Sequence, residues 1–283
     1  MASLRDIRNR AIQKLDQGGN ETSGLDVDLL LEEATGLTPL DFILTPGRHI
    51  NSAQEADFQT LLDRRLLREP ISQILGRKDF WTLTFKVSRH CLTPRPDSEV
   101  LIEAALKSIA DKKKPLKILD LGTGSGCLIL SLLSELPHSM GTAVDISDKA
   151  LDLAKENARR LGFQERCTFI LSDWAQALPP GERFDIILCN PPYIAEEEAE
   201  TLAPDVHDYE PHIALFAKDN GIEEYQKLGK ILPGLITAGG HAFLEIGHEQ
   251  GLRAENIFKN KGAHNIRIMQ DLAGRDRCIA LDF

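Results

Sequence analysis

The sequence has no long block of basic residues. Its 283 residues include 33 Lys and Arg against 43 Asp and Glu, which gives a formal net charge of −10 at pH 7. A protein that binds duplex DNA usually has a basic surface that neutralises phosphates, and the densest basic run here is residues 112–114. The acidity therefore favours a basic protein or a small molecule as partner, and we expect no direct nucleic acid partner.

Cysteine pairs, metal-ligand spacings and membrane-length apolar runs are also missing. The five cysteines form no C-x-x-C pair, and the eight histidines are scattered, so we predict no metal site. Unpaired cysteines beside apolar runs are typical of reduced, buried thiols in a cytoplasmic protein. No apolar stretch approaches the ~20 residues that cross a bilayer, so we expect no membrane partner.

The first 70 residues predict a small helical bundle. Apolar residues recur at helical spacing over residues 4–15, which favours a helix over a targeting peptide. A second helix is predicted over 25–34, and Ser52 with Glu55 forms a capping box that begins a later one. We interpret residues 1–70 as an N-terminal domain for substrate recognition.

The pattern changes after residue 70. Apolar and polar residues alternate over 81–87, which predicts a half-buried strand. We expect this strand to pair with residues 71–75 across Gly76 in a β-hairpin, and we interpret residues 71–90 as a linker.

From residue 91 onward, predicted strands alternate with amphipathic helices. Apolar runs predict seven strands, at 117–122, 142–146, 168–171, 184–189, 241–246, 266–270 and 278–281. Such alternation is typical of an α/β fold with a doubly wound, mostly parallel sheet. The last two strands form a hairpin through Gly274, which we expect to supply an antiparallel edge strand.

A glycine-rich turn follows the first of these strands, with the sequence Asp120-Leu121-Gly122-Thr123-Gly124-Ser125-Gly126-Cys127. Its glycines let the backbone approach a ligand closely. Asp145 ends the second strand, where a carboxylate can accept both hydroxyls of a ribose. The spacing differs from the G-x-G-x-x-G dinucleotide fingerprint, and Asp120 repels a pyrophosphate but suits the ammonium group of a methionine moiety. We therefore prefer S-adenosylmethionine to NAD, although the loop alone also fits an ordinary tight turn.

Asp173 and Trp174 follow the third strand. Asp173 can accept a hydrogen bond from an adenine amino group, and Trp174 can provide an apolar wall for the ring. A core tryptophan beside a helix-capping aspartate explains the local pattern equally well. Their position favours the cofactor site, because the carboxyl ends of parallel strands converge on one crevice.

Asn190-Pro191-Pro192-Tyr193 follows the fourth strand, which must end there because proline cannot donate a ladder hydrogen bond. Asn190 Oδ1 and the Pro191 carbonyl are two acceptors that can hold both protons of one planar NH2 group. Tyr193 can cover the flat face of that group. The tetrapeptide predicts chemistry on an amino or amide nitrogen, with Asn190, Pro191 and Tyr193 as catalytic residues, Pro192 as a substrate contact and Asn190 also beside the cofactor.

Together these motifs resemble those of the class I methyltransferases that act on amino groups, a Rossmann-like family. Further stretches are similar to the peptide chain release factor glutamine N5-methyltransferases. They are Glu69-Pro70-Ile71, Phe80-Trp81, Thr93-Pro94-Arg95-Pro96-Asp97-Ser98-Glu99, Tyr209-Glu210-Pro211 and Leu244-Glu245-Ile246-Gly247. The resemblance covers nearly the whole chain. Ser98 stands where the family pattern has threonine, and it keeps the hydroxyl.

The resemblance implies methyl transfer from S-adenosyl-L-methionine, without a metal, to the side-chain amide of the glutamine in the Gly-Gly-Gln motif of release factors. S-adenosyl-L-homocysteine is the implied product. Residues 91–283 are then the methyltransferase domain, and release factors are the protein partner. Nothing in the sequence demands more than a monomer.

Two alternatives stay open. The same tetrapeptide serves enzymes that methylate adenine N6 or guanine N2 in nucleic acid, and a non-catalytic cofactor-binding module is the alternative of another class. Several residues also have plain structural interpretations. Arg95 and Glu99 fit a cofactor entrance or a helix N-terminus, Glu245 fits an edge hydrogen-bond acceptor better than a catalyst, and residues 275–277 fit a charged hairpin turn. Residues 195–200 fit the border of a substrate channel or a solvated loop.

Overall fold

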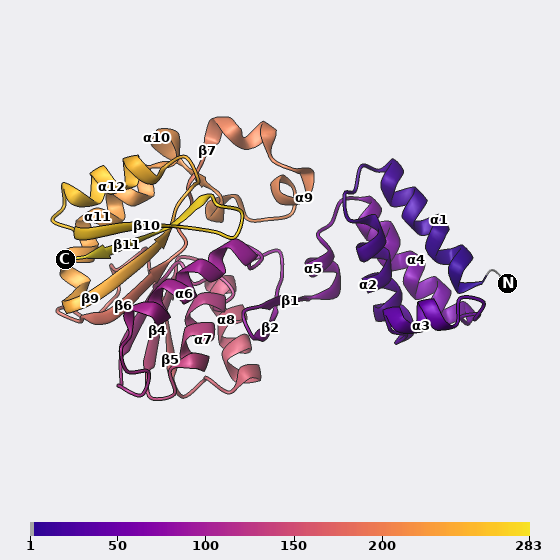
Figure 1. Ribbon diagram of the computed structural model, residues 1–283, viewed down its shortest axis with the longest axis horizontal. Helices are drawn as coiled ribbons and strands as arrows, with labels where there is room; N and C mark the ends of the chain where they lie inside the picture. Colours follow the sequence, from indigo (N-terminus) through magenta and orange to yellow (C-terminus); the bar gives the residue numbers. More distant parts are fainter. Residues whose placement is uncertain (1–2) are drawn as a thin grey trace. The chain divides into compact units, whose positions relative to one another are not determined.

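The computed structural model describes residues 3–283 and divides the chain into two compact units (Figure 1). One unit comprises the chain up to Gly76 together with the short segment Pro204–Tyr209. The other comprises Arg77–Ala203 and Glu210–Phe283. Within residues 3–283, no helix combines the length and apolar character that crossing a bilayer requires.

The first unit is a bundle of helices around its own core. Its helices are α1 (Leu4–Gln17), α2 (Ser23–Thr35), α3 (Pro39–Leu44), α4 (Ser52–Leu66), α5 (Ile71–Leu75) and α9 (Pro204–His207). Apolar side chains from α1, α2 and α4 fill the core, among them Leu15, Leu30 and Leu62. A buried ion pair joins α2 to α4, with Arg65 Nε 2.7 Å from Asp26 Oδ2.

Two local predictions for this region were wrong. The capping box of α4 begins one residue earlier, because Asn51 Oδ1 accepts from Gln54 N and Gln54 Oε1 accepts from Asn51 N. Residues 71–75 form helix α5 and not a strand, and this helix ends at Gly76 in the left-handed conformation. The hairpin instead pairs β1 (Arg77–Phe80) with β2 (Leu83–Lys86).

The segment Pro204–Tyr209 belongs to the first unit although it lies far along the chain. Arg68 Nη2 is 3.5 Å from Asp205 Oδ1. Tyr209 Oη donates to the Leu67 carbonyl at 2.6 Å, and Gln73 Nε2 donates to the Tyr209 carbonyl at 3.2 Å. No local sequence pattern indicates this return, since each contact joins residues more than a hundred positions apart.

The second unit is built on a seven-stranded sheet in the order β10-β11-β9-β6-β3-β4-β5. Its strands are β3 (Lys117–Leu121), β4 (Met140–Asp145), β5 (Cys167–Leu171), β6 (Phe184–Cys189), β9 (Ile236–Glu245), β10 (His264–Gln270) and β11 (Asp276–Asp282). The prediction of a mostly parallel sheet is confirmed. The antiparallel strand, however, is β11, which lies between β9 and β10 and not at the edge.

Helices cover both faces of this sheet. Figure 1 shows α6 (Glu99–Ser108), α7 (Cys127–Glu135) and α8 (Asp148–Leu161) on one face, and α11 (Glu223–Leu235) and α12 (Gly251–Lys259) on the other. Strand residues alternate between the two cores, with Ile118 facing the first layer and Leu119 the second. Burial on both faces explains why these strands are apolar runs.

The shorter elements lie around the carboxyl edge of the sheet. They are η1 (Pro96–Ser98), β7 (Ile194–Ala195), η2 (Glu196–Thr201), η3 (His212–Ala214), β8 (Phe216–Ala217) and α10 (Lys218–Gly221). Strands β7 and β8 pair in parallel. Residues 195–200, for which a solvated loop was one prediction, therefore lie in a short strand and a 3-10 helix.

Candidate active site

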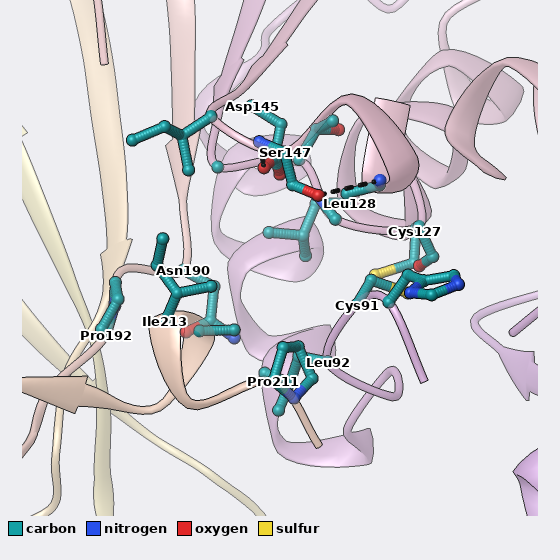
Figure 2. A pocket seen from close by; sticks show the side chains of 18 of the residues that line it. Cys91, Leu92, Cys127, Leu128, Asp145, Ser147, Asn190, Pro192, Pro211 and Ile213 are labelled. Carbon is teal, nitrogen blue, oxygen red and sulfur yellow. Dashed lines mark hydrogen bonds between the residues drawn. The ribbon is translucent and has the colours of Figure 1, made fainter. Parts of the chain in front are cut away.

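A cavity of about 390 Å³ lies in the second unit at the carboxyl ends of β3, β4, β5 and β6 (Figure 2). Parallel strands place their following loops at this edge, which is the usual ligand position in open α/β sheets. Most of the predicted site residues line this cavity, namely Gly122, Thr123, Gly124, Ser125, Asp145, Asp173, Trp174, Asn190 and Pro192. The structure thus places residues from the loops after four separate strands around one cavity.

The glycine-rich turn approaches the cavity through left-handed backbone. Gly122, Gly124 and Gly126 have φ of 74°, 56° and 81°, which side chains rarely tolerate. Gly122 N and Thr123 N both donate to the Val144 carbonyl, so the turn is fixed to the end of β4. Gly126 does not line the cavity, and its conformation instead turns the chain into α7.

Asp120 lies beneath this turn and does not face the cavity. Its side chain is fully buried, and Thr123 Oγ1 donates to its Oδ2 at 2.6 Å. Burial raises the pKa of the Asp120 carboxyl to about 7. The expected contact between Asp120 and a ligand ammonium is therefore absent, and the residue braces the turn from below.

Asp145 presents its carboxylate at the end of β4. Oδ2 accepts from Gly124 N at 2.8 Å and Oδ1 accepts from Ser147 N at 2.9 Å. Each oxygen keeps a further lone pair for a ligand hydroxyl. Burial raises the pKa of this carboxyl, and the hydrogen bonds from the backbone oppose that shift. The carboxylate is thus held in one orientation toward the cavity (Figure 2).

Trp174 forms a wall of the cavity beside the glycine turn. Its backbone is left-handed, with φ of 47°, and a methyl group placed on Gly122 would lie 3.7 Å from its ring. The indole Nε1 donates to Glu224 Oε2 at 2.9 Å. Asp173 lies beside it and accepts from Gln176 Nε2 at 2.8 Å. Glu224 and Lys227 also line the cavity, and the sequence reasoning missed both.

Asn190 lies at the end of β6 and faces the cavity (Figure 2). Its Nδ2 donates to Ser98 Oγ at 3.3 Å. Within residues 3–283, no hydrogen bond reaches Asn190 Oδ1 or the carbonyl oxygen of Pro191. Pro191 is buried and is not itself part of the cavity lining. The two predicted acceptors are therefore free of partners in the described part of the chain.

The Tyr193 side chain points away from the cavity. The sequence predicts instead that its ring covers the flat face of the acceptor group. Its Oη donates to Glu245 Oε1 at 3.0 Å and accepts from Arg277 Nη1 at 3.3 Å. Its carbonyl accepts from Gln250 Nε2 at 2.8 Å. Burial raises the pKa of the Tyr193 phenol, so it stays protonated and donates. The ring anchors the tetrapeptide and does not line the cavity.

Arg277 and Ser98 are further residues near the site that the sequence reasoning missed. Arg277 was placed in a charged turn but lies in β11, where it is 8% exposed. Arg95 lines the cavity and is also the N-cap of η1, so its position fits both predicted interpretations. Its Nη2 lies 3.0 Å from Glu210 Oε1. Glu99 instead accepts from Trp81 N at 2.7 Å, in the packing of the hairpin.

The chain also contains cysteine thiols and other side chains of the types that bind metal ions. Across residues 3–283, no group of three or more His, Cys, Asp or Glu side chains is arranged to hold a metal ion. All five cysteines are free, and burial raises the pKa of the Cys91 thiol to about 12. The ionisable side chains that line the cavity include Asp145, Asp173, Glu224, Arg95 and Lys227.

Comparisons with known proteins give the family. A model described as "PrmC N-terminal domain" matches residues 6–76, and one described as "Methyltransferase domain" matches residues 112–238. A release factor glutamine methyltransferase of Caulobacter vibrioides is 36% identical over 95% of this chain and 92% of its own length. Another, of Cereibacter sphaeroides, is 38% identical over 97% and 96%. The chain belongs to the release factor glutamine methyltransferase family.

The fold agrees with this family. A solved 16S rRNA methyltransferase of T. thermophilus superimposes with a TM-score of 0.53, at 18% identity, over 73% of this chain and 49% of its own. Identity that low shows the fold alone. The prediction of a methyltransferase enzyme on an α/β sheet is confirmed, and so is the resemblance that the motifs had indicated.

Proposed function

We propose that this protein transfers a methyl group from S-adenosyl-L-methionine to the side-chain amide nitrogen of the glutamine in the Gly-Gly-Gln motif of peptide chain release factors. One observation carries the proposal. Asn190 Oδ1 and the Pro191 carbonyl are acceptors without partners in the described residues, and Asn190 shares its cavity with the glycine turn and Asp145. Release factors are the acceptors named for the curated relatives.

The residues at the cavity fit this cofactor. Asp145 has lone pairs for ribose hydroxyls, and Trp174 offers a flat apolar surface for an adenine ring. The glycines leave room for close approach of the backbone. When bound, the cofactor supplies a methyl group on a positively charged sulfur, which leaves as a neutral thioether.

The task of the acceptor residues is alignment. An amide nitrogen is a weak nucleophile because its lone pair is delocalised into the carbonyl. Asn190 Oδ1 and the Pro191 carbonyl can accept both amide protons, which fixes the plane of the amide and raises the electron density on nitrogen. Orientation of this kind can lower a barrier by several kcal/mol. No dedicated base is needed, because the nitrogen becomes acidic once it is methylated.

The helical unit is the part that we assign to recognition of the release factor. The segment 71–90, interpreted from the sequence as a linker, is divided between this unit, which ends at Gly76, and the methyltransferase unit, which begins with the β1–β2 hairpin. Helix α3 exposes Leu40, Ile43 and Leu44 by 60%, 75% and 68%, and exposed apolar groups of this kind often mark binding surfaces. Ile43→Ser should then raise the KM for release factor and leave kcat unchanged. Leu252→Ser, at a position 76% exposed on α12, is the matched control.

The free cysteines support a reducing compartment. We therefore propose that the protein acts in the cytoplasm. We also propose that it acts as a monomer, as expected from the sequence.

Mass spectrometry of a release factor after incubation with the enzyme and labelled cofactor tests the proposal. We expect one added methyl group on the glutamine of Gly-Gly-Gln, and none on a release factor in which alanine replaces that glutamine. Parallel incubations contain tRNA, rRNA or DNA. Transfer to a nucleic acid but not to the release factor would overturn the proposal. Methylation that Asn190→Ala leaves unchanged would also overturn it.

A further inference from the structure

We infer that Glu245 is a positioning residue for methyl transfer, because its buried carboxylate sets the orientation of Asn190 through Ser98 and also holds Tyr193. The inference rests on the proposed function and adds a residue that neither touches the cavity nor faces the acceptor. Glu245 is the last residue of β9 and is 2% exposed. It lies behind the tetrapeptide and outside the cavity lining.

Both carboxylate oxygens of Glu245 accept hydrogen bonds from residues that hold the site. Ser98 Oγ donates to Oε2 through a short hydrogen bond. Tyr193 Oη donates to Oε1 at 3.0 Å. One buried carboxylate therefore joins the end of η1 to the tetrapeptide that follows β6.

The carboxylate decides the direction of the whole chain of hydrogen bonds. An ionised carboxylate can only accept, so the single hydroxyl proton of Ser98 must point toward Glu245. Ser98 Oγ is then left as an acceptor, and the group that reaches it is Asn190 Nδ2 at 3.3 Å. The NH2 end of the Asn190 amide is thus turned toward Ser98, and Oδ1 is left for the substrate.

If Glu245 did not orient the Ser98 hydroxyl, the Asn190 amide could adopt two orientations of the same shape, which differ by the exchange of its oxygen and its NH2 group. The flipped orientation would point an NH2 group at the NH2 group of the substrate, and neither could accept from the other. A carboxylate that cannot donate removes this second orientation. The positioning role therefore requires the charged form of Glu245.

The second arm of the network fixes the backbone of the tetrapeptide. Tyr193 follows Pro191 by two residues, and its phenol is held between Glu245 and Arg277 Nη1. Gln250 Nε2 holds the Tyr193 carbonyl at 2.8 Å. Anchoring this end of the segment keeps the direction of the Pro191 carbonyl constant. The two acceptors are thus positioned from the same carboxylate.

Several ionisable or hydrogen-bonding groups surround Glu245 and set its charge. They are Asp97 and Ser98 from η1, Cys127 from α7, Cys189 and Tyr193 from β6 and its loop, Tyr225 from α11, and Arg277 and Cys278 from β11. Burial raises the pKa of the Glu245 carboxyl, and Asp97 adds to the rise. The hydrogen bonds from Ser98 and Tyr193 and the charge of Arg277 oppose it.

This balance gives the network a pH dependence of known sign. A raised pKa means that Glu245 becomes protonated at a higher pH than an ordinary glutamate. The protonated carboxyl can donate to Ser98 Oγ, which frees the Ser98 proton to point at Asn190 and favours the flipped amide. Methyl transfer should therefore be complete above the raised pKa and decline as the pH falls through it.

Kinetics of the full-length protein with release factor and S-adenosylmethionine test the inference. Glu245→Gln keeps the shape but adds a donor, and Ser98→Ala removes the relay. We expect each to lower kcat about 10- to 100-fold, the scale of a misplaced reacting group, while calorimetry shows unchanged affinity for S-adenosylmethionine. Ser98→Thr keeps the hydroxyl and should restore turnover. Ser131→Ala, a fully buried serine in α7, is the control for packing.

The pH profile separates positioning from structural support. The wild type should lose kcat on the acid side, and Ser98→Ala should lack that decline because the relay is gone. If Glu245→Gln fails to fold, the pair Ser98→Ala and Ser98→Thr decides. Wild-type turnover in both Glu245→Gln and Ser98→Ala would overturn the inference, and so would losses that appear only in thermal stability or cofactor affinity. A wild-type protein that leaves release factor unmethylated would instead overturn the proposed function.

Discussion

The two halves of the site are built in different ways. The cofactor half consists of the glycine turn and Asp145. The backbone N–H of Gly124 in the turn donates a hydrogen bond to Asp145 Oδ2. The acceptor half consists of side chains that join distant parts of the chain. Asn190 and Ser98 are 92 positions apart, and Ser98 and Glu245 are 147 apart.

We infer from this difference that the two halves control different quantities, the affinity for the cofactor and the rate of transfer. A cradle of backbone and one carboxylate sets how tightly the cofactor binds. A relay of side chains with fixed donor and acceptor roles sets how well the acceptor amide is oriented. Substitutions in the first half should therefore change affinity, and substitutions in the second should change the rate.

Asn190→Ala should have the largest effect, because it removes an acceptor that touches the reacting amide. We expect kcat for release factor to fall about 100-fold or more, with affinity for S-adenosylmethionine largely retained. Quenched-flow kinetics and calorimetry measure the two quantities. Asn256→Ala, at an exposed position on α12, should behave as wild type. A parallel fall in affinity would contradict the division between the halves.

Gly221→Ala should disturb the backbone that supports the acceptor half. Gly221 has φ of 80°, and an added Cβ would lie 2.2 Å from the Tyr193 carbonyl oxygen. Backbone cannot yield easily, so we expect the free energy of unfolding to fall by about 2 kcal/mol or more. Urea titration measures the change. Gly162→Ala is the control, because Gly162 has φ of 82° and no neighbour within 4 Å. Equal losses in the two variants would show that the contact with Tyr193 does not matter.

Asp145→Ala should act on the cofactor half. It removes the acceptor that we assign to the ribose hydroxyls and releases Gly124 N. We expect the dissociation constant for S-adenosylmethionine to rise about tenfold, the scale of one or two charge-assisted hydrogen bonds. The rate of transfer at saturating cofactor should change little. Calorimetry with single-turnover kinetics checks both, and a large loss of rate at saturation would count against the account.

Trp174→Phe should have the smallest effect. The ring keeps an aromatic wall, but the hydrogen bond from the indole to Glu224 is lost. We expect a rise of about fivefold in the dissociation constant, the scale of one neutral donor to a carboxylate at a partly exposed site. Lys227→Met is the control, because it removes a charge from the cavity lining but leaves the hydrogen bond from Trp174 to Glu224 in place. A similar rise in this variant would show that the charge of the lining matters and not the hydrogen bond.

The sequence predicted the cofactor half better than the acceptor half for a physical reason. Glycine spacing and a carboxylate at a strand end are local patterns, and parallel strands bring their ends together without further information. Even so, Asp120 was misplaced, since nothing in the sequence says that its side chain turns under the loop. The capping box of α4 and the helix at residues 71–75 were missed because neighbouring choices were equally compatible with the local pattern.

In the acceptor half, the sequence identified the tetrapeptide but not what holds it. Tyr193 was predicted to face the substrate because its ring is flat and adjacent. Its orientation depends on Glu245 and Arg277, which lie on β9 and β11. Arg277 looked like part of a charged hairpin turn together with Arg275 and Asp276. Only the sheet order, with β11 beside β9, brings that guanidinium to the tetrapeptide.

A double-mutant cycle of Ser98→Ala and Asn190→Ala tests most directly whether the relay acts through Asn190. Single-turnover methyl transfer to the release factor is measured for the wild type, the two single variants and the double variant. Because Ser98 acts only by orienting the Asn190 amide, Ser98→Ala should slow the wild type about tenfold or more and have no further effect in the Asn190→Ala background. Equal losses in both backgrounds would contradict the account.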